Sequence, residues 1–123
     1  MIPKRRQIEK KLDYSMEEQV VGKWLDGKNL YRKTITINAL KYGEEMILSQ
    51  ISNADSIFVK NSYVINSTSG YTTSVGTYYP TTNRESRIWA DAKAGYIKCF
   101  LGTGWQNIVN QLVTTIEYTK TTN

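Results

Sequence analysis

The chain of 123 residues contains no histidine, one cysteine and two prolines. The lack of histidine removes the usual general base of Ser/His and Cys/His catalysis and the commonest metal ligand in proteins. Cys99 stands alone, so it can form neither an intrachain disulfide nor a thiolate metal cluster. It lies in the apolar alternation Ile97, Cys99, Leu101, a pattern that predicts a buried thiol. We therefore expect no enzyme, no cofactor and no metal.

Long apolar runs and spaced acidic motifs are equally scarce. No early apolar stretch is long enough for a signal peptide or a membrane span, so we expect a soluble protein without membrane insertion. Two adjacent carboxylate pairs occur, Glu17-Glu18 and Glu44-Glu45. Neighbours along a strand point to opposite faces, so neither pair can by itself flank a sugar ring as the carboxylates of a glycosidase do. A cross-pair such as Glu18 with Glu45 stays open from the sequence alone.

Most of the chain alternates with a period of two residues, the pattern of half-buried strands. Alternating segments rich in threonine, tyrosine, valine and isoleucine cover residues 30–37, 57–65, 86–90 and 112–118. Clusters of Gly, Asn, Asp and Ser separate them, as between the strands of a sandwich or barrel. Helical pieces are expected only at residues 4–13 and in a turn near residues 40–47. We predict an all-β fold, an antiparallel β-sandwich or jelly-roll-like domain over residues 14–123, preceded by a basic N-terminal arm or helix over residues 1–13.

Three segments predict turns and loops. Two apolar runs, residues 20–25 and 30–37, flank the dipeptide Asp26-Gly27, which readily supplies the positive φ angles of a two-residue type I′ turn, so a β-hairpin is expected here. Residues 102–104, Gly-Thr-Gly, lack the Lys-Ser/Thr of a phosphate-binding loop and predict a second tight hairpin loop. The Thr- and Ser-rich residues 62–83 are interpreted as a long loop, or as a loop with an edge strand.

The net charge of +5 and the pI near 9.3 raise the question of an anionic partner. Much of the excess lies in the N-terminal arm, whose basic residues are Lys4, Arg5, Arg6, Lys10 and Lys11. Elsewhere both signs mix, and a local basic arm indicates nucleic-acid binding less strongly than a basic face running across a fold. Ile8 and Leu12 are four residues apart and can share one side of a helical turn, which suits a stub for packing or trimerisation. We interpret the arm as a means of attachment, with nucleic-acid binding as the lesser alternative.

The aromatic residues are the main candidates for binding. Nine tyrosines and three tryptophans accompany only two phenylalanines, a bias toward rings that also hydrogen-bond, as in protein interfaces and sugar-stacking platforms. Trp24, Trp89 and Tyr118 fall in expected strands, which favours core or subunit packing. Loops on a rigid scaffold are where binding residues usually lie. The candidate ligand-binding residues are therefore the aromatics in or beside loops, with packing as an equal alternative: Tyr71, Tyr78, Tyr79 and Trp105.

Two segments of the chain resemble bacteriophage tail proteins. Residues 14–33 read YSMEEQVVGKWLDGKNLYRK and residues 116–122 read IEYTKTT. A segment of the form YSTEEQVVGxWxDGKPLYRK near one end, with a threonine-rich IEYTKTT segment at the other, is typical of tail fibres, baseplate components and host-recognising tips. The resemblance covers about a fifth of the chain and includes no catalytic residue.

The resemblance implies a virion-associated β-domain that recognises the host cell surface, a glycan or a protein. It also implies a homotrimer with other tail proteins as neighbours, made in the bacterial cytoplasm without a signal peptide and located in the phage tail. Two alternatives stay open. One is a purely structural tail or baseplate component, and the other is a small nucleic-acid-binding or host-inhibitory phage protein that uses the basic arm.

Overall fold

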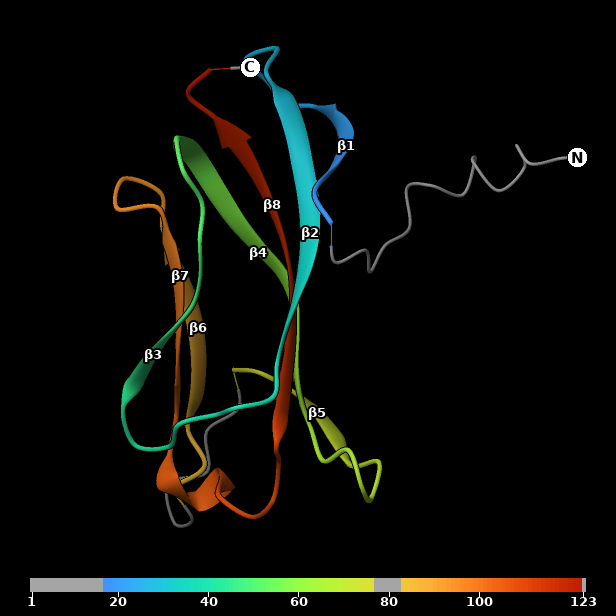
Figure 1. Cartoon of the computed structure of the whole chain (residues 1–123), viewed down its shortest axis with the longest axis vertical. Coiled ribbons are helices and arrows are strands. Elements are labelled where there is room, and N and C mark those ends of the chain that lie inside the picture. Colours follow the sequence, from blue (N-terminus) through green and yellow to red (C-terminus); the bar gives the residue numbers. More distant parts are fainter. Residues whose placement is uncertain (1–16, 77–82, 123) are drawn as a thin grey trace, which may run out of the picture.

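The protein folds into two facing antiparallel β-sheets, seen in a computed structural model that describes residues 17–76 and 83–122. The strands are β1 (Gln19–Lys23), β2 (Asn29–Ile37), β3 (Glu45–Gln50), β4 (Ala54–Ile65), β5 (Thr72–Ser74), β6 (Ser86–Asp91), β7 (Tyr96–Leu101) and β8 (Gln111–Lys120), with a 3₁₀ helix η1 at Thr103–Trp105. The larger sheet has the order β1-β2-β8-β4-β5 and the smaller β3-β7-β6, and they form the two layers of Figure 1. The predicted all-β sandwich is confirmed.

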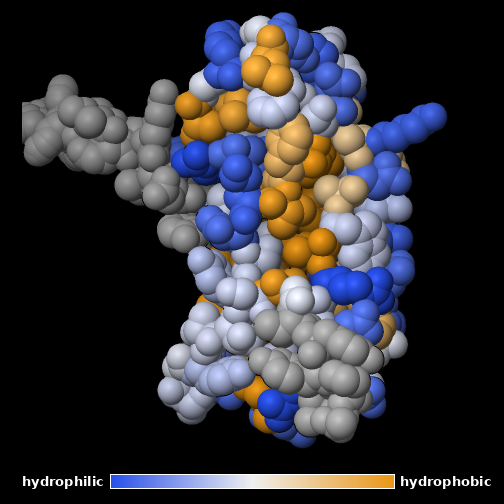
Figure 2. All heavy atoms as spheres, turned by 180° about the vertical axis from the view of Figure 1, so that it is seen from behind, coloured by the Kyte–Doolittle hydropathy of each residue, from blue (hydrophilic) through white to orange (hydrophobic). Residues whose placement is uncertain are grey.

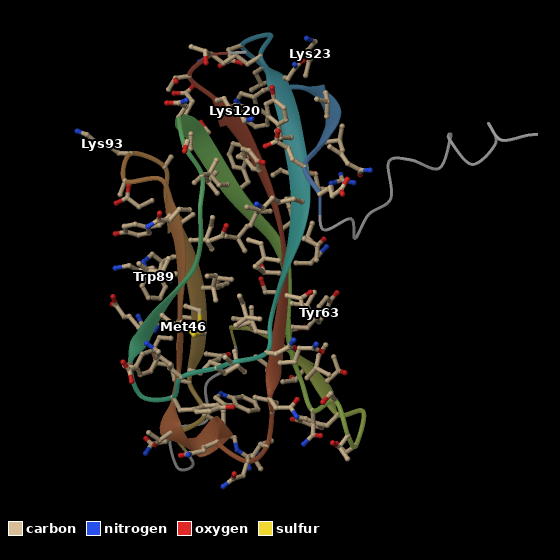
Figure 3. The ribbon with its side chains drawn as sticks, viewed as in Figure 1. Lys23, Met46, Tyr63, Trp89, Lys93 and Lys120 are labelled. Atoms are coloured by element: carbon tan, nitrogen blue, oxygen red, sulfur yellow. The ribbon has the colours of Figure 1, made fainter. Side chains whose placement is uncertain are left out.

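The core lies between the two sheets and is built by the alternation that the sequence shows. Ile97, Cys99 and Leu101 of β7 are fully buried, as is Leu112 of β8. Met46 of β3 points into the same space in Figure 3. The predicted burial of Cys99 is thus confirmed, and desolvation raises the pKa of its thiol to about 11. Because the thiolate is the reactive form, this thiol stays inert at neutral pH.

β8 is the central strand of the five-stranded sheet. It pairs with β2 on one side and with β4 on the other, and residues 114–119 are all buried. A side chain on a central strand has neighbours on both flanks, so polar groups there need partners within the sheet. Thr114 shares a hydroxyl hydrogen bond with Ser62 (2.7 Å), and Thr115 shares one with Thr34 (2.9 Å).

The predicted hairpin is present as β1 and β2, but its turn differs from the expected type I′. Trp24 N–H donates to the Lys28 carbonyl (2.8 Å) and Gly27 N–H donates to the Trp24 carbonyl (2.9 Å), the pattern of a three-residue loop. Gly27 has φ of +86°, whereas Asp26 is not among the residues with positive φ. The Asp26 side chain instead accepts the Lys28 N–H (3.0 Å), which holds the loop in its longer form.

The helical piece predicted near residues 40–47 is wrong, because a strand, β3, begins at Glu45. Along β3, Met46 and Leu48 are buried while Ile47 is 51% exposed, which is the period of a strand. β3 lies at an edge of the smaller sheet and pairs with β7. Tertiary pairing with β7 therefore decides the conformation of this segment over its local composition.

Two further loop predictions have different outcomes. Residues 102–104 are not a hairpin loop, because β7 and β8 belong to different sheets and η1 lies in the connection between them. Alternation identifies strands but does not say which of them pair. Within residues 62–83, β5 pairs with residues 63–65 of β4 as an edge strand, in agreement with the second interpretation of that segment. The expected helical piece at residues 4–13 lies outside the described residues.

Candidate binding surface

The structure describes two of the four candidate aromatics, and these two differ in exposure. Tyr71 is 45% exposed in the turn that leads to β5, where its carbonyl accepts the Asn66 N–H (2.8 Å). Tyr78 and Tyr79 lie outside the described residues. Trp105 is fully buried in η1, which favours packing over a ligand contact, the two alternatives that the sequence left open for it.

Trp105 is buried because its connection passes from one sheet to the other across an end of the sandwich. Its ring joins the apolar cluster between the sheets, and the Arg84 guanidinium lies 5.6 Å from the ring centroid. The indole N–H has no hydrogen-bond partner among the described residues. Trp105 therefore belongs to packing, the other alternative that the sequence left open.

A different set of aromatic residues gathers on the outer face of the three-stranded sheet. Since Ile97, Cys99 and Leu101 point inward, the alternate residues of β7 point outward. The same holds for β6, and Figure 3 shows Trp89 on the side away from the larger sheet. We call this surface the ring-and-cation face, and its members are Arg87, Trp89, Tyr96, Lys98 and Phe100.

The pairing of β6 with β7 interleaves rings and cations on this face. Arg87 lies opposite Phe100, and Trp89 lies opposite Lys98. The Arg87 guanidinium lies 4.9 Å from the Phe100 centroid and 5.5 Å from the Trp89 centroid, while Lys98 Nζ lies 4.5 Å from the Tyr96 centroid. These distances are within the range of cation–π attraction, so the cations and rings hold each other in place.

Acidic neighbours balance the charge of the face. Glu85 pairs with Arg87 (Nε to Oε2, 2.5 Å) and Glu45 of β3 pairs with Lys98 (3.4 Å). The side chains of Arg87 and Glu45 are 53% and 58% exposed, so both pairs lie in water and are individually weak. The face thus offers partly exposed rings together with hydrogen-bond donors and acceptors, and little net charge.

An open hollow of about 480 Å³ adjoins this face at β6. Its lining residues are Val75, Gly76, Ser86, Arg87, Ile88 and Trp89. An apolar stripe runs down the same side of the molecule in Figure 2. β4 and β6 contact each other, and both carry partly buried apolar residues that pack against the core, among them Ile57, Val59, Ile88 and Ala90. A hollow with a ring, a guanidinium and an apolar floor is of the size that binds small ligands.

A second polar cluster joins Glu18, the residue before β1, to β8. The Tyr118 hydroxyl donates a hydrogen bond to Glu18, and Lys120 Nζ lies 3.0 Å from the other carboxylate oxygen. Burial alone would raise the pKa of Glu18, but the hydrogen bonds from Tyr118 and Lys120 and the charges of Lys120 and Lys33 hold it below its usual value. Burial and the same hydrogen bond raise the pKa of Tyr118.

The contacts of this cluster are those of a packing cluster. Tyr118 stacks on Tyr31 (5.6 Å between centroids), and Lys120 Nζ lies 4.4 Å from the Tyr31 centroid. Glu18 directly precedes β1 and bonds to Tyr118 of the larger sheet, whereas Glu45 lies with Lys98 on the outer face of the smaller one. The cross-pair of Glu18 with Glu45 that the sequence left open is therefore not brought together across a cleft.

Other kinds of site are not found in the described part of the chain. Residues 17–76 and 83–122 contain no group of three or more His, Cys, Asp or Glu side chains that could hold a metal ion. Within the same ranges, no helix is long and apolar enough to span a membrane. Comparison with protein-family models, with curated proteins and with solved structures finds no match to this chain.

Proposed function

We propose that the chain is a phage tail-associated adhesion domain that binds a neutral or weakly charged glycan of the host surface through the ring-and-cation face. The observation that carries this proposal is the group of three partly exposed rings, Trp89, Tyr96 and Phe100, on two adjacent strands. Strands hold side chains more rigidly than loops do, so the rings are arranged before a ligand arrives.

The chemistry of the face suits a sugar. The C–H faces of a pyranose pack on aromatic rings, and the hydroxyl groups need donors and acceptors close to those rings. Arg87 and Lys98 supply donors, and Glu45 supplies acceptors. Each cation already has an acidic neighbour. A strongly anionic ligand would therefore gain little binding free energy from these cations, so the face suits a neutral ligand better.

Weak individual sites suffice if several copies act together. Linked sites raise overall affinity by roughly 10² to 10⁴ without new contacts, provided that all of them can reach their ligands. The resemblance to tail proteins implies three copies, and that number stays a prediction. We propose that the basic arm over residues 1–13 attaches the domain to neighbouring tail proteins.

A purely structural role in a tail or baseplate is the second candidate. The apolar stripe between β4 and β6 in Figure 2 favours it, since partly exposed Ile57, Val59 and Ile88 suit packing against another virion protein. On that alternative the rings contact protein, and isolated oligosaccharides do not bind. The arm-dependent alternative, nucleic-acid binding, predicts instead a complex that weakens steeply as salt rises.

A glycan array of bacterial surface oligosaccharides tests the proposal. We expect binding by the full chain and a loss of about fivefold in each of Trp89→Ala and Tyr96→Ala, since each removed stacking contact contributes roughly a kilocalorie. Tyr63→Ala is the matched control, because Tyr63 lies on the outer face of the larger sheet in Figure 3. Neutralising Lys4, Arg5 and Arg6 should leave binding unchanged. Equal losses in Tyr96→Ala and Tyr63→Ala, or loss only in the arm variant, would contradict the proposal.

A further inference from the structure

Among the described strands that end a sheet, β6 has a charge pattern that the others lack. Four described strands end a sheet, namely β1, β3, β5 and β6. β1 carries Lys23 alone, β3 carries Glu45 alone and β5 carries no charge. β6 carries opposite charges on one face, Arg87 and Asp91, two residues before and two residues after Trp89.

This pattern is complementary to itself when reversed. In an antiparallel pair with Trp89 opposite its own equivalent, Arg87 of each copy lies opposite Asp91 of the other. Ile88 then lies opposite Ala90 on the inner face, so apolar side chains meet apolar side chains. We propose that a second copy of this chain pairs along β6, antiparallel and with the two-fold axis at Trp89.

The charged groups are placed for such a pair. Side chains directly opposite each other on antiparallel strands have Cβ atoms roughly 4.5–5.5 Å apart, within reach of an ion pair. Glu85 engages Nε of Arg87, and the guanidinium has further N–H donors. Asp91 accepts the Ala94 N–H through Oδ1 (3.1 Å), and Oδ2 remains for an incoming guanidinium. Stacking over Trp89 and Phe100 already orders Arg87, which lowers the entropy cost of pairing.

The surroundings of β6 give the pair space and an apolar contact. The open hollow beside the strand leaves room along its edge at Ile88 and Trp89. A second strand there would cover part of the apolar stripe that Figure 2 shows between β4 and β6. Unpaired edges commonly carry charges that repel other strands, whereas the charges on β6 attract a reversed copy of the same strand.

Pairing would join the two three-stranded sheets into one sheet of six strands, with the ring-and-cation faces side by side. The value of this arrangement for ligand binding rests on the proposed function, because two adjacent faces could engage one extended glycan. The pairing itself does not depend on a ligand. A two-fold pair also differs from the three-fold assembly that the resemblance implies, so mass alone distinguishes them.

Charge swaps test the pair. Sedimentation equilibrium of the full chain without ligand should give twice the chain mass of 14.1 kDa as concentration rises. Arg87→Asp and Asp91→Arg each place like charges opposite one another, and each should weaken association at least about tenfold. The double variant Arg87→Asp with Asp91→Arg restores opposite charges and should restore the dimer. Lys23→Asp on β1 is the control and should leave the mass unchanged.

A cysteine at the axis gives an independent measurement. Trp89→Cys would face its own equivalent within disulfide distance and should form a covalent dimer on mild oxidation. Val20→Cys on the edge of β1 should not, and the native Cys99 is fully buried. A wild-type monomer or trimer, or a double swap that stays monomeric, would overturn the pairing. A monomer that still binds glycan would overturn the pairing alone, and a dimer that binds none would overturn the proposed function alone.

Discussion

The outer faces of the two sheets use similar residues to opposite effect. On the five-stranded sheet, Glu117 is 8% exposed, and its Oε2 accepts a hydrogen bond from Arg32 Nε (2.8 Å) and lies 2.7 Å from Arg32 Nη2. Lys60 Nζ lies 3.8 Å from its other carboxylate oxygen. Beside it, Thr34 and Thr115 bond to each other and are buried. On the three-stranded sheet, the cations lie over partly exposed rings and their acidic partners are in water.

The difference supports the proposed placement of the binding surface. A polar group whose partners are already within the protein has little to gain from a ligand, because a new hydrogen bond would only replace an existing one. Exposed rings and solvated ion pairs can contribute binding free energy, because a ligand displaces water from them. This contrast is why we propose recognition on the smaller sheet, whereas the outer face of the larger sheet contributes to stability.

The largest expected effect separates two tryptophans. Trp105→Ala should destabilise the protein by about 3–5 kcal/mol, because it removes a fully buried indole from the core. Trp89→Ala should cost less than about 1 kcal/mol, since its half-buried ring faces solvent on the outer face. Urea unfolding of both variants measures this. Comparable losses would mean that the ring-and-cation face is also part of the stability of the fold.

The next prediction compares two glutamates. Glu117→Ala should cost about 1.5–3 kcal/mol, because the Arg32 guanidinium loses a partner in a poorly solvated place. Glu45→Ala should cost less than about 0.5 kcal/mol, because its pair with Lys98 is solvent-exposed. Thermal melts of the two variants at equal ionic strength test the contrast. If the order were reversed, the outer face of the larger sheet would not be the stabilising one.

The smallest effect concerns acid. Since the pKa of Glu18 is lower in the folded protein than in the unfolded chain, ionised Glu18 contributes stability above about pH 4.5. That contribution falls as the pH drops through the folded pKa. Glu18→Gln should therefore be less stable than the wild type near pH 7, with the gap closing as the pH falls below 4.5 and through the lowered pKa of the folded state. A gap independent of pH would show that the carboxylate charge is not involved.

The sequence predicts strands well where one face is apolar and the other polar. Residues 57–65 and 112–118 alternate clearly, and they lie within β4 and β8. The segment Met46-Ile47-Leu48 is apolar on both faces, so its period is hidden and helix-forming neighbours suggest a turn. Only the pairing with β7 reveals the strand.

The candidate surface is harder to predict, because alternation does not say which face of a strand points inward. Trp89 lies between Ile88 and Ala90, so either face of β6 could have been the buried one. Trp105 follows Gly-Thr-Gly, a local sequence typical of an exposed loop. Its burial depends on the crossing from one sheet to the other, a long-range feature that no local pattern carries.

The place of β8 also has a consequence during synthesis. β8 lies between β2 and β4 in space but follows both in the chain, and its contacts span long separations, as between Arg32 and Glu117, 85 residues apart. At roughly 5 to 20 residues per second on the ribosome, β2 waits several seconds for its partner. During that interval the nascent chain holds two strands with unsatisfied edges. The hairpins β1–β2 and β4–β5 can pair locally in that time, but the five-stranded order is completed only when β8 inserts between β2 and β4.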